Sequence, residues 1–153
     1  MLNSLDRQRD SALLLLRVLL GLTLVFAHGL PKVLAPDRWE ATGRAMEAIG
    51  IGFAPVFWGF MAGATELAAG VLFLAGFAVR PAAAVMVFVM FVAAAQSLAT
   101  AGTLGGGRAH PIDAAAGYIV LLMLGAGSCS LDRRLGFDRP GAADARPTAV
   151  TPV

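Results

Sequence analysis

Charged residues are scarce in this sequence. Only 14% of its 153 residues are Asp, Glu, Lys or Arg, whereas soluble domains carry about 25%. No charge occurs from Pro81 to Gly107, and Glu66 is the one charged residue from Phe53 to Val79. Runs of about 20 apolar residues are long enough to cross a bilayer, so the composition excludes an ordinary water-soluble domain and predicts an integral membrane protein.

Residues that hold metals or redox groups are also scarce. The single cysteine, Cys129, excludes an internal disulfide, a CxxC pair and a thiolate cluster. Two histidines are too few for an axially paired haem plus a second His-based centre, so we predict no metal. The net charge of +2, without a basic stripe interleaved with aromatics, predicts no nucleic-acid partner. Cys129 is interpreted as a small packing residue, with a reactive thiol as the open alternative.

Four apolar segments predict four transmembrane helices, over residues 11–30, 53–77, 82–101 and 111–131. A secretory signal peptide is the alternative for the first segment, but Arg17 interrupts it and no A-x-A cleavage site follows. We therefore predict one membrane domain over residues 11–135. It lies between a polar tail, 1–10, and a tail rich in Arg, Asp, Pro and Ala, 136–153, which we expect to be disordered.

The only long polar connection, residues 31–52, has the signals of a short helix. Pro36 is suited to a helix start and Gly50 to a helix end. Trp39, Met46 and Ile49 fall on one apolar side, which predicts an interfacial helix with Trp39 at headgroup depth. A loop with scattered charges is the alternative. The predicted fold is thus all-α, a membrane-embedded four-helix bundle with a short interfacial helix between spans one and two.

The distribution of Lys and Arg predicts the orientation of the bundle. With four spans, both termini and the second loop share one side of the membrane. Seven basic residues lie on that side: Arg7, Arg9, Arg80, Arg133, Arg134, Arg139 and Arg146. Four lie on the other: Lys32, Arg38, Arg44 and Arg108. The excess predicts that both termini are cytoplasmic.

Arg17 and Glu66 are the first candidates for chemistry, because a charged side chain inside a span is costly. Counting along the two predicted spans places both at a similar depth, about 18–21 Å from the outer surface, where they could form a buried ion pair. Such a pair would provide a proton-active carboxyl or an anchor for a quinone-like headgroup. The alternative is that it only fixes how two helices dock.

A second group of polar residues lies at the outer ends of the spans. Arg17, Gly21, His28 and Lys32 share one face of the first span, because their spacings of four, seven and four match helical periodicity. His28 and Lys32 predict a polar pocket at the outer mouth, which three further residues could join: Gln96, His110 and Asp113. The alternative is that these residues are interfacial caps and snorkelling groups.

Small residues predict close helix packing. Gly59 and Gly63 form a GxxxG pattern, and Gly70 follows Glu66 by one turn. The pattern leaves open whether the packing is inside the bundle or in a homo-oligomer.

The chain resembles the DoxX family of small bacterial membrane proteins over about residues 12–135. The matching segments are LLRVLLGLTLVFAHGLPKVL, GATELAAGVLFLAGFAVRPAA and LLMLGAGSCSLDRRL. Family-like positions are Arg17, Gly21, Gly29, Lys32, Glu66, Gly70, Gly125, Gly127 and Ser130–Asp132. One departure is Asp113, where family members often have Glu at the start of span four.

The resemblance implies a protein of the bacterial inner membrane that is a subunit or anchor of a redox system, with a quinone or a thiol system involved. Named members of the family are linked to quinol oxidase and thiosulfate:quinone oxidoreductase complexes. A chain without a redox centre of its own would need a bound quinone or a redox enzyme partner. Two other functions remain open: a non-catalytic membrane adaptor for a soluble enzyme, and a small proton-coupled transporter.

Overall fold

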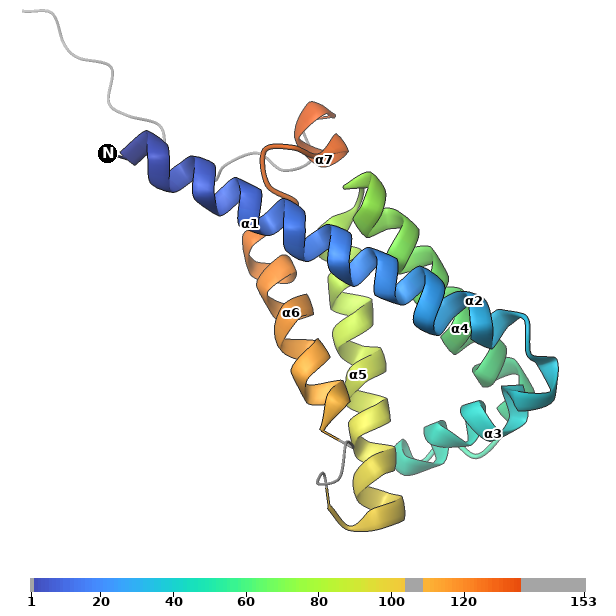
Figure 1. Cartoon of the computed structure of the whole chain (residues 1–153). Helices are drawn as coiled ribbons and strands as arrows, with labels where there is room; N and C mark the ends of the chain where they lie inside the picture. The colour runs from blue at the N-terminus through green and yellow to red at the C-terminus, as the bar shows by residue number, and fades with distance from the viewer. Residues whose placement is uncertain (1, 104–108, 136–153) are drawn as a thin grey trace, which may run out of the picture.

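The computed structural model describes residues 2–103 and 109–135, and every regular element in these ranges is helical (Figure 1). The first half contains α1 (Leu2–Leu22), the π-helical η1 (Thr23–Gly29), α2 (Leu30–Val33), η2 (Pro36–Arg38), α3 (Trp39–Gly43) and η3 (Arg44–Ile49). The second half contains α4 (Pro55–Ala75), α5 (Val79–Ala101), α6 (His110–Leu124) and α7 (Leu131–Arg134). The predicted all-α class is confirmed.

Three helical stretches are long and apolar enough to cross a membrane: Arg7–Val33, Pro55–Ala75 and Val79–Ala101. The fourth apolar helix, α6, has only 15 residues, or about 22 Å. The prediction that it extends to residue 131 is wrong, because the chain leaves the helix at Gly125 (φ 76°) and turns again at Gly127 (φ 77°). Both glycines have positive φ values that other residues rarely adopt. The membrane bundle thus has three long helices and one shorter one.

The first helix is longer than predicted at both ends. It begins at Leu2 instead of residue 11, and it continues through Pro31 to Val33. Proline has no N–H to donate to the preceding turn. The preceding turns are π-helical, and the Leu30 N–H donates to the Val25 carbonyl, five residues back. This wider turn lets the helix continue past the proline, so Lys32 is a helical residue and not part of a loop.

Glycines on α4 bring its backbone close to the first helix. A Cβ added at Gly70 would lie 2.9 Å from the carbonyl oxygen of Gly21, and one at Gly63 would lie 2.9 Å from the Cβ of Lys32. Contacts this short exclude any side chain larger than hydrogen. The predicted close packing is therefore confirmed, and these glycines serve contacts inside the bundle.

The connection between the first two spans is helical, as predicted, from Pro36 to a left-handed Gly50 (φ 87°). It folds back onto α4. The Trp39 ring packs edge-on against Phe60, with ring centroids 5.0 Å apart, and its indole N–H donates to the Lys32 carbonyl (2.8 Å). Trp39 therefore ties α3 to the end of the first helix.

The core lies where α4, α5 and α6 meet. Phe73, Met86 and Leu121 are fully buried there, and the Phe73 and Tyr118 rings lie 5.9 Å apart. Figure 1 shows α5 and α6 side by side with α1 crossing them. Many large apolar side chains point outward instead: Leu15, Leu19, Phe26, Val71, Phe91 and Met123 are examples. Such an apolar exterior on membrane-length helices is suited to contact with lipid.

Candidate functional site

Arg17 and Glu66 are both buried, but they do not pair. The Arg17 guanidinium donates to the carbonyl oxygens of Ala126 (2.7 Å) and Cys129 (2.8 Å). Glu66 Oε1 instead accepts from Lys32 Nζ at 2.6 Å. The predicted Arg17–Glu66 ion pair is wrong.

The register between the first helix and α4 explains this correction. A Cβ at Gly76 would lie 2.7 Å from the Arg17 guanidinium, and one at Gly29 would lie 2.5 Å from the backbone nitrogen of Leu67. Arg17 is thus level with residue 76, ten residues or about 15 Å beyond Glu66. The depth count assumed that the two spans begin at the same level. Instead, the first turns of α4 extend past the end of the first helix and are covered by α3.

Glu66 forms the centre of the candidate site. Only 2% of the residue is exposed, and its Oε2 is buried without a hydrogen-bond partner among the described residues. Its partner Lys32 is partly open, with 35% of its side chain exposed. A buried carboxylate oxygen without a partner is destabilising, because it loses its hydrogen bonds to water and forms none with the protein. The site therefore has one strong acceptor available to a donor.

A cavity of about 420 Å³ lies against this ion pair, walled by α3, η3, α4 and α5. Its polar lining comes from Lys32, Thr42, Trp58, Thr65, Glu66 and Gln96, and its apolar lining includes Met46, Met61, Val85, Phe88, Val89 and Val92. The indole Nε1 of Trp58 is a second buried polar atom without a partner among the described residues. The size and the mainly apolar walls with few polar groups are typical of small-molecule sites.

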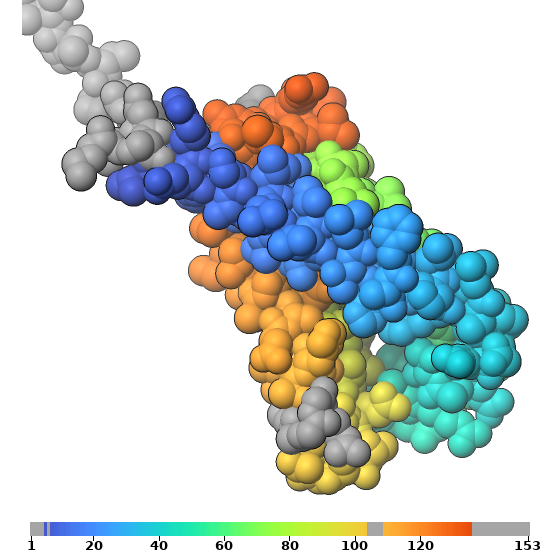
Figure 2. All heavy atoms as spheres, viewed as in Figure 1, coloured from blue at the N-terminus to red at the C-terminus, as the bar shows by residue number. Residues whose placement is uncertain are grey.

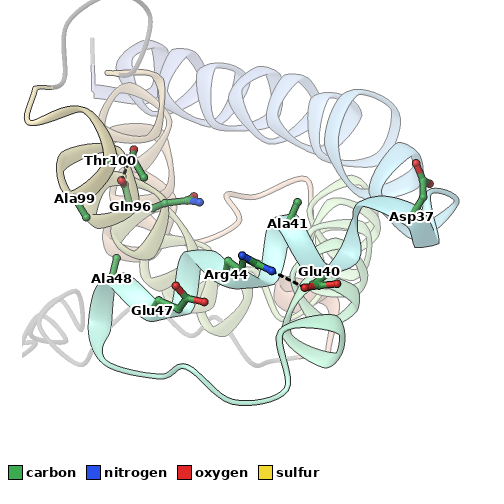
Figure 3. A pocket seen from close by; sticks show the side chains of 9 residues that line it. All are labelled: Asp37, Glu40, Ala41, Arg44, Glu47, Ala48, Gln96, Ala99 and Thr100. Carbon is green, nitrogen blue, oxygen red and sulfur yellow. Dashed lines mark hydrogen bonds and ion pairs between the residues drawn. The ribbon is translucent and has the colours of Figure 1, made fainter.

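A second, wider cavity of about 700 Å³ lies beside the first, between α3–η3 and the end of α5. We call it the vestibule. It is lined by Asp37, Glu40, Ala41, Arg44, Glu47, Ala48, Gln96, Ala99 and Thr100 (Figure 3). Figure 2 shows the surface hollowed between α3 and α5. Gln96 lines both cavities and extends from α5 towards α3, so it marks where the charged vestibule meets the apolar cavity.

Arg44 is held in the vestibule by Glu40, one turn before it. The Arg44 guanidinium donates to Glu40 Oε1 at 2.7 Å, and this hydrogen bond raises the pKa of Arg44 above its ordinary value. Both side chains are exposed, so the pair adds little stability.

The five residues of the predicted outer pocket do not all lie together in the structure. Lys32 and Gln96 line the same cavity. His28 is half-buried, with its ring centroid 5.7 Å from that of the exposed His110. Asp113 lies exposed in the first turn of α6 and belongs to the lining of neither cavity. Whether any of these residues binds a ligand stays a prediction.

At the opposite end of the bundle, the carboxylate of Asp132 caps the start of α5. Its carboxylate accepts from the backbone N–H groups of Ala78 (2.7 Å) and Val79 (3.0 Å), which begin α5. Its own N–H donates to the Gly76 carbonyl (3.0 Å). Ser130 caps α7 by accepting from the Arg133 N–H. Asp132 was not among the predicted site residues, although it lies in the Ser-Leu-Asp segment that carries the resemblance.

We expect Asp132→Ala to lower the free energy of unfolding by about 2 kcal/mol, because loss of a helix-capping side chain costs about 0.5–2 kcal/mol and the freed N–H groups are buried. Thermal melting in detergent, followed by circular dichroism, measures this. Asp113→Ala, which removes an exposed carboxylate, is the matched control and should melt like the wild type. Equal melting of both variants would show that the Asp132 cap adds no stability.

Cys129 has an exposed side chain, and its backbone carbonyl accepts from Arg17. The exposure of the side chain contradicts the interpretation of Cys129 as a small packing residue, and the reactive thiol stays a prediction.

Comparison with known proteins gives one match. The family model DoxX matches residues 12–101, which is more than half of the chain. The matched region contains Arg17, Lys32, Glu66 and Gln96, and it ends at the last residue of α5. No curated protein and no solved structure matches the chain.

Proposed function

This chain belongs to the DoxX family, and from that premise we propose that it is a redox-associated membrane subunit whose cavity at Lys32 and Glu66 holds the headgroup of a quinone. The observation that carries the proposal is the unpartnered Glu66 Oε2 at the wall of a largely apolar cavity. In this proposal the bound quinone would supply the electron chemistry.

The lining of the cavity fits a flat ring with polar atoms at its edge. Phe88, Val89 and Val92 offer apolar surface to the ring. Lys32 Nζ and the free indole N–H of Trp58 are donors for a carbonyl oxygen, and Glu66 Oε2 is an acceptor for a hydroxyl. The same site can therefore hold the oxidised and the reduced form of one ring.

The outward face of α5 provides an entrance for an apolar tail. Val85 and Phe88 line the cavity, and they are also about half exposed on the apolar exterior, at 47% and 51%. An amphipathic ligand could therefore place its headgroup at Glu66 while its tail stays in lipid. A purely water-soluble ligand would have no use for this apolar entrance.

We also propose that the Arg17 end of the bundle faces the cytoplasm of a bacterial cell. The first helix begins at this end and α6 finishes there, since Asp10 accepts from the Ser128 N–H at 3.2 Å. The excess of Arg on this side supports the orientation. The vestibule and the Lys32–Glu66 site then lie nearer the outer surface, and a redox partner would supply or accept the electrons.

Titration of the purified protein in nanodiscs with a short-chain benzoquinone tests the proposal. Trp58 lines the cavity and Trp39 belongs to α3, which forms part of its wall, so the tryptophan fluorescence of the unaltered chain reports on a ligand in the cavity. We expect saturable quenching. Glu66→Gln and Lys32→Met should each weaken the affinity about tenfold or more, because hydrogen bonds to charged groups contribute about 1.5–3 kcal/mol.

The control for this titration is Glu47→Gln, which changes a carboxylate in the vestibule but not in the cavity. It should bind like the wild type. Quenching that rises linearly without saturation, or that is unchanged in the Glu66 variant, would contradict a quinone site at this position.

A further inference from the structure

Three titratable side chains surround Glu66, each from a different element. Lys32 pairs with it from α2. Electrostatic interactions connect Glu66 with His28 of η1 and with the buried Tyr118 of α6, and His28 also interacts with Lys32. Glu66 thus belongs to a cluster of groups that can exchange protons, at one end of an apolar bundle.

The backbone contact between η1 and α4 places His28 beside Glu66. Gly29 meets Leu67 so closely that an added Cβ would lie 2.5 Å from the Leu67 nitrogen. His28 and Glu66 are the residues immediately before these two in the chain. The π-helical form of η1 is confined to residues 23–29, and single π-helical turns in α-helices occur frequently at functional sites.

His110 extends the cluster to the surface. Its ring centroid lies 5.7 Å from that of His28, with the planes tilted by 46°. His28 is half-buried and His110 is exposed. The two rings therefore lie in sequence between the side of the bundle that holds Glu66 and the outside of the molecule, with His110 at the surface.

We propose that His28 and His110 form a proton path between the buried Glu66 carboxyl and the surface at the His110 end of the bundle. A proton leaving Glu66 Oε2 binds one ring nitrogen of His28, the other nitrogen releases a proton to His110, and His110 releases one to water. The same steps in reverse protonate Glu66. No electrons move and no bond other than those to hydrogen changes, so the path does not depend on the identity of any ligand in the cavity.

Infrared difference spectroscopy of the full chain in nanodiscs after a pH jump tests this path. The carboxyl band that disappears in Glu66→Gln identifies the Glu66 signal. We expect His28→Gln and His110→Gln to slow the change of this band at least about tenfold, while its final amplitude stays the same. His110 is exposed, so its variant keeps the test valid if His28→Gln fails to fold.

Two controls separate a path from a general effect on the bundle. Asp113→Asn changes a charge one turn along α6 from His110, and Glu47→Gln changes a carboxylate in the vestibule. Both should keep the wild-type rate. An unchanged rate in both histidine variants, or a Glu66 band that never changes with pH, would overturn the path. The infrared experiment uses the protein without ligand. Its outcome therefore does not depend on whether the quinone titration succeeds or fails.

Discussion

Replacing Arg17 by methionine is expected to destabilise the bundle more than any other single change of a polar side chain. Arg17 is 3% exposed, and its guanidinium donates to the carbonyls of Ala126 and Cys129. Loss of this donor costs about 1–3 kcal/mol for each hydrogen bond. We expect a loss of about 2–6 kcal/mol in the free energy of unfolding, measured by thermal or SDS-induced unfolding in detergent.

The comparison of Arg17→Lys with Arg9→Met separates geometry from charge. Lysine keeps the charge but cannot fork across two carbonyls, so we expect Arg17→Lys to recover only part of the stability. Arg9 is exposed on the same helix, and Arg9→Met should unfold like the wild type. If Arg17→Met were as stable as Arg9→Met, the two hydrogen bonds would not hold the C-terminal segment in place.

The membrane spans could be predicted from the sequence because hydropathy alone determines them. Residues 53–77 and 82–101 contain nearly all of α4 and α5. Helix ends were predicted less well, since they depend on backbone geometry. The first span was predicted to end at residue 30, but the helix continues past Pro31 to Val33, after a π-helical stretch. The two positive-φ glycines after α6, Gly125 and Gly127, fall inside the predicted span 111–131, and glycine is also common inside membrane helices.

The candidate site could be predicted only in part, because hydropathy does not contain the register between helices. Periodicity placed His28 and Lys32 on one face, and both do lie beside Glu66. The partner of Glu66 was wrong, since depth was counted from the ends of the apolar runs. The outer ends of the first two apolar segments lie at different depths, because α4 extends past the first helix and its first turns are covered by α3.

Trp58 illustrates a further limit of the sequence. A tryptophan near the start of a span is typical of the aromatic belt at the membrane surface. In the structure it lines the cavity, and its indole N–H is buried. Nothing in the sequence around residue 58 distinguishes these two roles, because the opposite wall of the cavity comes from two other elements, η3 and α5.

Replacing Gly59 by alanine is expected to separate α3 from α4. The added Cβ would lie 1.8 Å from the Trp39 carbonyl oxygen, a distance that no side-chain rotation can relieve. Since backbone must move, we expect a loss of at least about 1–3 kcal/mol in the free energy of unfolding, by the same unfolding assay. Gly52→Ala is the matched control, because nothing lies within 4 Å of its added Cβ. Equal stability of the two variants would contradict the close α3–α4 contact.

Replacing Gly43 of α3 by alanine tests the same α3–α4 contact. It also tests whether moving α3 changes the cavity. An alanine Cβ at Gly43 would lie 1.8 Å from the Pro55 carbonyl, so either substitution alone displaces α3. Once α3 has moved, the second clash no longer occurs, and the double variant should lose less stability than the sum of the two. Thr42 of α3 and Met46 of the adjoining η3 then leave the cavity wall. Quinone affinity should therefore fall in both single variants, although neither glycine offers a side chain to a ligand.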